Sequence, residues 1–215
     1  MLTIYGADIS SPANKVRSVA NYIGIEYEYR RVNLREGEQK QEWFQKINPV
    51  GKVPAMDDNG FRLFESGAIC KYLCEKASSS LYPQDLQQRA IVEQWTDFAT
   101  LHITVNVSKV IFNRLFAKRM GYPVSEESIA DGLKFLSQNL PHIEGQLGAH
   151  KYLAGAQPTL ADMTLLAGLD PCELASIDLG QYPNITAWRQ GLKGQSFYTK
   201  CHKEYGEMLK QPAGK

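Results

Sequence analysis

The pattern of apolar residues at the N-terminus predicts a strand, a helix and a second strand. Residues 2–6 form a short apolar run typical of a buried strand. Apolar residues then repeat at helical spacing over 12–24, where Ser11 is suited to the N-cap and Gly24 to the end of the helix. Residues 26–34 are predicted to form a second strand. Elements in this order form a right-handed crossover between two parallel strands.

The following segment predicts the rest of a small mixed domain. Residues 38–46 fit a short helix. Two strands are expected at 53–56 and 61–64, because Asp58-Asn59-Gly60 between them is an apt hairpin connection. A helix over 66–76 completes the domain.

Beyond residue 77 the pattern becomes helical. Residues 78–86 begin with small and polar side chains and include Pro83, as expected of a linker. No convincing strand follows, and the periodicity predicts helices at 87–118, 125–147, 159–169, 184–193 and 196–209. The predicted fold class is therefore an α/β N-terminal domain over 1–77, a linker over 78–86 and an all-α C-terminal domain over 87–215.

One helix start in the second half is unusually well marked. Thr159-Leu160-Ala161-Asp162 has the spacing of a capping box, in which the first and fourth residues satisfy each other's backbone N–H groups. Pro158 and Met163 are placed as a hydrophobic staple around it. This motif concerns folding and carries no chemistry.

Composition and charge exclude several classes of protein. The 215 residues include 24 Lys or Arg and 23 Asp or Glu, so no strong field would gather nucleic acid or an anionic membrane surface. The N-terminus does not have the pattern of a secretory signal, and no apolar stretch reaches the roughly 18 residues that span a bilayer. We expect a cytoplasmic protein without nucleic-acid or membrane partners.

Cysteine and histidine give no sign of a metal site. The four cysteines are too scattered for a disulfide framework, which favours a reducing compartment; they are Cys70, Cys74, Cys172 and Cys201. Cys70 and Cys74 share one face of a predicted helix, and we interpret them as buried packing thiols in preference to a redox or metal pair. The four histidines are dispersed. We therefore expect no metal.

Two motifs together describe a pocket for a small zwitterionic peptide. In Asn48-Pro49-Val50-Gly51-Lys52-Val53-Pro54, a cis bond before Pro54 would present the backbone of Val53 outward, where a bound peptide could pair with it. Glu65 and Ser66 open a helix, so a carboxylate can receive an ammonium group while the hydroxyl and helix N–H groups receive a carboxylate. Taken singly, each motif also fits ordinary turn and capping chemistry.

With these motifs in this order, followed by a helical domain, the chain resembles the cytosolic glutathione transferases over nearly its whole length. The resemblance implies a thioredoxin-like N-terminal domain that binds glutathione and a helical domain that shapes the pocket of the second substrate. YGADISSP matches the spacing of theta- and delta-like members, and REGEQKQEWFQKINPVGKVPAM and NVSKVIFNRLFAKRMG look like the phi class. The resemblance therefore points to a serine-type, phi/theta-like transferase that uses glutathione as co-substrate without a cofactor.

Ser10 is the predicted catalytic residue. Free thiols have a pKa of about 8.5, so an enzyme must stabilise the glutathione thiolate. A hydroxyl donor contributes roughly 1.5–3 kcal/mol to a charged acceptor, and a helix N-terminus about 0.3–1 kcal/mol more. Ser10 would act as this donor and not as a nucleophile, whereas Ser11 is expected only to cap the helix. Tyr5 is a rival donor, since other classes of the family use a tyrosine at the end of the first strand.

The resemblance also assigns the residues that hold glutathione. Glu65 and Ser66 would bind its γ-glutamyl end, and the Val53 backbone its cysteinyl amide. Lys40 and Lys52 would neutralise the glycyl carboxylate, unless they merely lie in a solvated loop. Gln39 stands where related members usually carry histidine. Val50 replaces an aromatic residue that inserts into the partner subunit in many phi-like members, so the expected homodimer would lack that contact.

The second substrate is expected to be a hydrophobic electrophile. Its predicted pocket is lined by Ile9, Phe112, Leu115 and Phe116, although the last three have a spacing that also fits core packing. Conjugation of glutathione is the leading interpretation, and hydroperoxide reduction is a further activity. The alternatives are a glutathione-dependent disulfide reductase, an isomerase or dehalogenase, and a transferase-like module used only for protein interaction.

Overall fold

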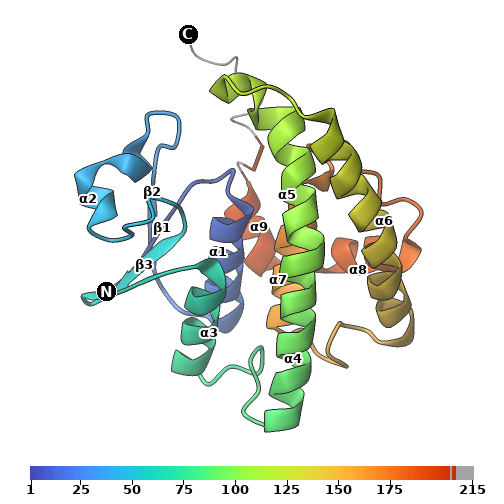
Figure 1. Cartoon of the computed structure of the whole chain (residues 1–215). Helices are drawn as coiled ribbons and strands as arrows, with labels where there is room; N and C mark the ends of the chain where they lie inside the picture. The colour runs from blue at the N-terminus through green and yellow to red at the C-terminus, as the bar shows by residue number, and fades with distance from the viewer. Residues whose placement is uncertain (204, 207–215) are drawn as a thin grey trace. The chain divides into compact units, whose positions relative to one another are not determined.

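The computed structural model describes residues 1–203, 205 and 206, which fall into two compact units (Figure 1). The sheet unit consists of Met1–Tyr82 together with the described residues from Gly194 onward. The helical unit covers Pro83–Lys193. A mixed α/β unit and an all-helical unit confirm the predicted fold class.

The sheet unit is built on four strands in the order β2-β1-β3-β4. Their bounds are β1 Leu2–Gly6, β2 Glu28–Arg31, β3 Ala55–Asp58 and β4 Phe61–Phe64. Strand β1 is parallel to β2 and antiparallel to β3, which is antiparallel to β4. The predicted parallel pair is therefore confirmed. Strand β3 begins at Ala55 and not at Val53, because Pro54 has no N–H group to donate to a ladder.

Helices pack around this sheet. They are α1 Ser11–Ile23, the 3₁₀ turn η1 Glu38–Lys40, α2 Glu42–Gln45, α3 Ser66–Lys76 and α9 Ser196–His202. Helix α1 packs against α3 and α9 (Figure 1). Helix α2 lies on the other side of the sheet, where Phe44 joins a buried cluster with Tyr5, Val32 and Ala55.

Residues that favour positive φ determine the end of α1 and the turn between β3 and β4, as predicted. Gly24 ends α1 in the left-handed conformation, with φ of 74°. Asn59 and Gly60 both have positive φ, 53° and 95°, as a two-residue hairpin turn requires. These residue types tolerate positive φ, and they therefore fix the lengths of α1 and of the β3–β4 hairpin.

The grouping of α9 differs from the predicted domain boundary, which assigns all of 87–215 to the helical domain. Within the sheet unit, Ser18 Oγ lies 3.2 Å from Cys201 Sγ, and Asn21 Nδ2 donates to Phe197 O at 3.0 Å. Helix α9 therefore packs along α1. The part of the predicted helix 196–209 at residue 204 and beyond residue 206 lies outside the described residues.

The helical unit consists of packed helices. Its elements are α4 Leu86–Phe98, η2 Ala99–Thr104, α5 Val105–Ile111, η3 Phe112–Phe116, η4 Lys118–Met120, α6 Glu126–Ala149, α7 Leu160–Leu169, η5 Asp170–Cys172 and α8 Pro183–Lys193. Helix α5 packs on α6, and α6 packs on α8. All residues of α7 are buried, so this helix forms the centre of the unit.

The segment predicted as one helix over 87–118 follows a continuous helical path that is interrupted twice. The segments η2 and η3 are π-helical, with bonds that skip one residue more than in an α-helix. At the end of η3, for example, Ala117 N–H donates to Phe112 O at 2.7 Å. Helical periodicity did not reveal these interruptions, because π turns keep a similar spacing of apolar residues.

The cysteines lie in the interior of the protein. All four cysteines are free and buried, and burial raises the pKa of Cys70 to about 11 and that of Cys74 to about 12. The interpretation of Cys70 and Cys74 as packing thiols is confirmed. In the part of the chain that the structure describes, no helix is both long and apolar enough to cross a membrane.

Candidate active site

Ser10 is the N-cap of α1, which corrects the prediction that Ser11 caps this helix. Ser10 has an extended backbone, and its Oγ accepts from Ala13 N–H at 3.3 Å. The helical ladder starts here, because Asn14 N–H donates to Ser10 O at 2.9 Å. Ser11 is instead the first helical residue, and its Oγ lies 3.2 Å from the hydroxyl of Tyr205.

Capping and thiol activation are compatible at Ser10. The cap uses a lone pair of Oγ as acceptor, which leaves the hydroxyl proton available to donate. Ser10 is half-buried, and its hydroxyl stands at the positive end of a helix of 13 residues. Ser10 can therefore donate to an anion while it caps α1.

Tyr5, the rival donor, is built into the core. It is buried in β1, and its ring packs against Trp43 and Phe44 with centroid separations of 6.4 and 6.3 Å. This aromatic cluster lies on the α2 side of the sheet, whereas Ser10 stands at the start of α1. The observed packing gives Tyr5 a structural role.

The loop before β3 is shaped by Asn48. This buried side chain donates to Lys52 O at 2.6 Å and accepts from Val50 N–H at 3.0 Å. Gly51 has φ of 65°, and a Cβ at this position would lie 2.9 Å from Gln39 O. The structure therefore places the loop that carries Lys52 directly against η1, which carries Gln39 and Lys40.

Gln39, Lys40 and Lys52, which are predicted to bind glutathione, differ in their surroundings. Lys40 and Lys52 are exposed. Gln39 is half-buried, and its Oε1 is buried without a hydrogen-bond partner among the described residues. An unpaired buried acceptor costs free energy, so a ligand with an N–H donor would stabilise Gln39. The amide of Gln39 could therefore form a polar contact with a ligand.

The other predicted peptide contacts lie just before β3 and at the start of α3. Val53 stands outside the ladder, and the peptide bond to Pro54 is cis, as the sequence suggests. Glu65 has φ of 70° and ψ of 114°, a strained conformation for a residue with a side chain. Such outliers cost about 1–3 kcal/mol and gather at functional sites.

The start of α3 is open to a ligand. Glu65 is its N-cap but makes no capping bond with its exposed side chain, and Ser66 is half-buried. Because the first helical bond runs from Ile69 N–H to Glu65 O, the N–H groups of residues 66–68 precede the helical ladder. A Cβ added at Gly67 would meet no atom within 4 Å. This end of α3 can accept a carboxylate.

The structure adds Lys15, a residue that sequence analysis missed. Lys15 lies in α1 with only 9% of its surface exposed, and no described residue forms a hydrogen bond or ion pair with its ammonium group. Burial lowers the pKa of Lys15, while the charges of Cys70 and Glu65 oppose that effect and Lys71 adds to it. A helical wheel could have found it, since Lys15 is four residues from Val19 on the apolar face.

We expect Lys15→Met to stabilise the protein by about 1–2 kcal/mol, because it removes a buried charge and leaves an unbranched apolar side chain that is only one atom shorter. The folded pKa of Lys15 lies below the ordinary 10.5. The unfolded chain therefore binds more protons between these values, and wild-type stability rises with pH in that window. The stability of Lys15→Met should lack this rise with pH.

Urea denaturation at about pH 8 and about pH 10 would measure the difference between the two proteins. Lys46→Met is the matched control, since Lys46 is exposed and its ammonium group pairs with Glu42 at 2.8 Å. Lower stability of Lys15→Met at both pH values would show that the ammonium group has a favourable partner, against the burial argument.

The residues predicted to line the electrophile pocket belong to both units. Ile9 is half-buried in the Ser10 loop of the sheet unit. Phe112, Leu115 and Phe116 lie in η3 of the helical unit. Phe112 is 40% exposed and therefore not a core residue, whereas Leu115 and Phe116 are half-buried. The pocket itself stays a prediction.

The described part of the sheet unit has hollows in its surface. A hollow of about 310 Å³ begins at the same loop as Ser10, and sequence analysis had no signal for it; its lining is Ala7, Asp8, Arg31, Val32, Asn33, Leu34 and Glu38. A larger hollow of about 740 Å³ lies around Tyr27, Tyr29 and Lys200 and contains none of the predicted site residues. Only the smaller one is relevant to Ser10. Among residues 1–203, 205 and 206 no cluster of potential metal ligands occurs.

Comparisons with known proteins show the family to which the chain belongs. Residues 1–75 match the family described as glutathione S-transferase, N-terminal domain, and residues 106–195 match the corresponding C-terminal domain. Glutathione S-transferase D7 of Drosophila melanogaster is 33% identical over 192 residues, which are 87% of this chain and 82% of that protein. The probable glutathione S-transferase GSTF2 of Oryza sativa subsp. japonica is 31% identical over 217 residues, with 99% of both chains covered.

Solved structures of glutathione transferases also resemble this chain. Human glutathione transferase theta-2, crystallised in complex with glutathione and an unknown ligand, superposes with a TM-score of 0.90 at 30% identity, covering 99% of this chain and 90% of that chain. The chain therefore belongs to the glutathione S-transferase family and is a transferase enzyme. The theta-class neighbour is consistent with the predicted serine-type, phi/theta-like character.

Proposed function

We propose that this transferase conjugates glutathione to hydrophobic electrophiles through a thiolate stabilised by Ser10. The observation that supports this most is the capping geometry, in which Oγ accepts from Ala13 N–H and keeps its proton for the sulfur. A free thiol is only a few per cent ionised at neutral pH. A hydroxyl donor supplies roughly 1.5–3 kcal/mol and the helix N-terminus about 0.3–1 kcal/mol more, and the thiolate is the major species at pH 7 once their sum exceeds about 2 kcal/mol.

The rest of glutathione would lie along the loop that carries Lys52 and Val53 and along the start of α3. Glu65 would bind the γ-glutamyl ammonium group, and Ser66 with the first N–H groups of α3 the carboxylate. The Val53 backbone would pair with the cysteinyl amide, and Lys40 and Lys52 would face the glycyl carboxylate. The strained Glu65 and the unpaired Gln39 Oε1 support a bound ligand here. A glutathione complex of the theta-2 relative supports its identity.

The electrophile would be apolar and would meet the thiolate beside Ile9. Phe112 is 40% exposed, so its ring is accessible to a ligand. Hydroperoxide reduction would use the same thiolate. No cofactor is needed for either reaction, since glutathione itself supplies the reacting sulfur.

The alternative functions have less support. Disulfide reduction through the protein needs a reactive cysteine in the active-site loop, and this loop carries Ser10 and Ser11 instead. All four cysteines are buried, and burial raises the pKa of Cys172 to about 12. A module used only for protein interaction would not need an open helix start beside a strained Glu65.

Two measurements test this proposal. We expect calorimetric titration with reduced glutathione to show one site per chain, and the purified protein to conjugate a chloronitrobenzene. Absence of heat at millimolar glutathione would favour the interaction module. Turnover of a hydroxyethyl disulfide without conjugation would favour the reductase.

Assembly and location complete the proposal. We propose a homodimer in the cytoplasm, where the reducing conditions suit four free thiols. Val50 is 51% exposed on its loop, so it is available for a partner subunit even though it is not aromatic. Sedimentation equilibrium would distinguish a dimer from a monomer.

A further inference from the structure

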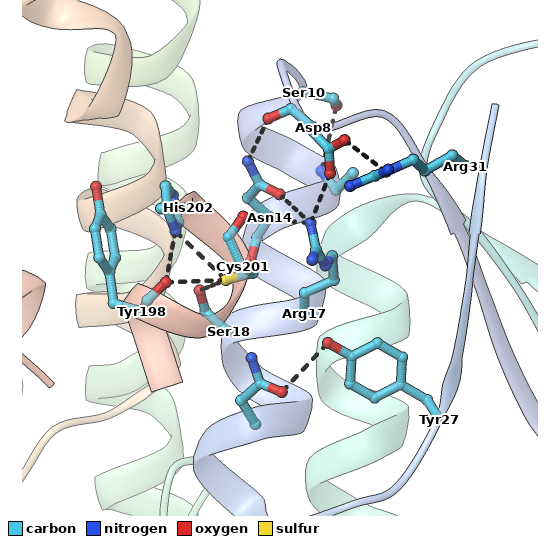
Figure 2. A network of polar contacts seen from close by, with 12 residues as sticks. Asp8, Ser10, Asn14, Arg17, Ser18, Tyr27, Arg31, Tyr198, Cys201 and His202 are labelled. Carbon is cyan, nitrogen blue, oxygen red and sulfur yellow. Dashed lines mark hydrogen bonds and ion pairs between the residues drawn. The ribbon is translucent and has the colours of Figure 1, made fainter. Parts of the chain in front are cut away.

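Arg17 of α1 lies at the centre of a polar network behind the Ser10 loop (Figure 2). Its Nη1 lies 3.1 Å from Asp8 Oδ1, 3.1 Å from Asn14 Oδ1 and 3.3 Å from Cys201 O. The guanidinium carbon stands 3.8 Å from the centroid of the Tyr29 ring. One side chain thus connects the loop after β1, helix α1, strand β2 and the last turn of α9.

This network fixes the backbone that carries Ser10. Asn14, which is fully buried, donates from Nδ2 to Asp8 O at 2.8 Å and from its backbone N–H to Ser10 O at 2.9 Å. Ser10 N–H donates to Ala7 O at 2.9 Å. Asn14 therefore holds both ends of the segment from Asp8 to Ser10, and Arg17 holds Asn14 and Asp8 together.

The Arg17–Asp8 pair is protected from solvent. The side chains of Arg17 and Asp8 are 11% and 19% exposed, while Arg31, which binds the other oxygen of Asp8 at 2.8 Å, is 59% exposed. Exposed pairs contribute little, whereas removal of one partner from a buried pair leaves an uncompensated charge. Loss of Arg17 should therefore affect the loop more than loss of Arg31.

The last turn of α9 supports the same guanidinium. Its carbonyl at Cys201 accepts from Arg17, as expected of a cation at a helix C-terminus. Cys201 Sγ lies beside Ser18 Oγ, and the His202 ring stacks on Tyr198 at 3.6 Å. Figure 2 shows these side chains grouped where α9 lies beside α1.

We propose that Arg17 is a positioning residue for thiol activation, which holds the Asp8–Ser10 segment against α1 and α9 so that the Ser10 hydroxyl meets the sulfur. This inference rests on the proposed role of Ser10. A hydrogen bond weakens steeply with poor geometry, so a small movement of this segment is sufficient to reduce it. Without Arg17, the charge of Asp8 would also be less compensated two residues from Ser10, and like charge disfavours a thiolate.

The test is Arg17→Met, which keeps an unbranched side chain and removes the guanidinium. We expect the thiol pKa of bound glutathione, measured by ultraviolet titration of thiolate absorbance, to rise by about one unit and kcat to fall about tenfold. The Kd for glutathione should change less than about threefold, because the residues proposed to bind it lie elsewhere. Arg17→Lys should give intermediate values, since an ammonium group lacks the planar fork.

Arg62→Met is the matched control. Arg62 also pairs with a carboxylate, Asp57 at 3.0 Å, and donates to a carbonyl, Lys46 O at 2.8 Å, but it lies in the β3–β4 hairpin. The thiol pKa of glutathione bound to Arg62→Met should equal that measured with the wild-type protein.

The outcomes separate this inference from the proposed function. An unperturbed thiol in the wild-type complex would contradict the role of Ser10 and this inference with it. A lowered thiol pKa in the wild type that is unchanged in Arg17→Met, even with a lower melting temperature, would make Arg17 purely structural. If Arg17→Met does not fold, Arg17→Lys tests the inference instead. A thiol pKa of bound glutathione in Arg17→Lys that is identical to the wild-type value would overturn the inference.

Discussion

Replacement of Ser10 by alanine should lower kcat for glutathione conjugation about tenfold to a hundredfold, because the lost hydroxyl contributes roughly 1.5–3 kcal/mol to a charged acceptor. The thiol pKa of bound glutathione should rise by about one to two units, towards that of the free peptide. Affinity for glutathione should change little, since Glu65, Ser66 and the Val53 backbone are untouched. Steady-state kinetics together with ultraviolet titration of the binary complex would measure both effects.

Ser10→Ala also removes a helix cap, at a cost of about 1 kcal/mol, so a stability control is needed. Ser10→Thr keeps both the hydroxyl and the cap, and it should retain most of the activity. Ser11→Ala is the neighbouring control: it removes a hydroxyl that contacts Tyr205 but leaves the N-cap intact. Tyr5→Phe tests the rival donor. Full turnover in Ser10→Ala, or a thiol shift only in Tyr5→Phe, would remove Ser10 from the mechanism.

The sequence predicts those features that depend on neighbouring residues. Gly24 and the Asn59-Gly60 pair set their own backbone angles, and the structure places α1 and the β3–β4 hairpin where these residues indicate. Strand β1 has the predicted bounds for a related reason, since a short apolar run has few alternatives beside a helix. Local chemistry was sufficient for these features, whereas the strand predicted over 26–34 is limited to β2 Glu28–Arg31.

Features that depend on distant residues were not predictable in this way. The choice of Ser10 over Ser11 as N-cap depends on the loop that Asn14 and Arg17 hold, and either serine satisfies the local rule. The grouping of α9 with the sheet unit depends on contacts such as Asn21 with Phe197, which are far apart in sequence. The burial of Lys15 depends on α3 in the same manner.

In the candidate site, too, some features depend on neighbouring residues and others on distant ones. The motifs around Val53-Pro54 and Glu65-Ser66 identified the segments that carry the proposed glutathione contacts, because each motif is a local arrangement of backbone groups. The unpaired Gln39 Oε1 and the close approach of Gly51 to η1 result from tertiary packing. Motifs therefore indicate where the proposed site lies, and packing decides how its side chains are paired.

In the helical unit, Asp162→Ala should lower the free energy of unfolding by about 3–5 kcal/mol, because it leaves several buried donors without an acceptor. The predicted capping box is confirmed: Thr159 N–H and Oγ1–H donate to Asp162 Oδ2 at 2.9 and 3.0 Å. The other oxygen accepts from Leu153 N–H at 3.0 Å and from Trp188 Nε1–H at 3.1 Å. Urea denaturation would measure the loss.

The size of this effect follows from where the cap lies. Asp162 is fully buried, and its carboxylate joins the start of α7 to the loop at Leu153 and to Trp188 of α8. Ser125→Ala is the matched control, because Ser125 caps α6 with a single exposed bond to Ser128 N–H at 3.1 Å and should cost only about 1 kcal/mol. Equal losses in the two variants would mean that Asp162 acts as an ordinary cap, with no role in joining α7 to α8. A loss several times larger in Asp162→Ala would show that this one carboxylate ties together three segments of the helical unit.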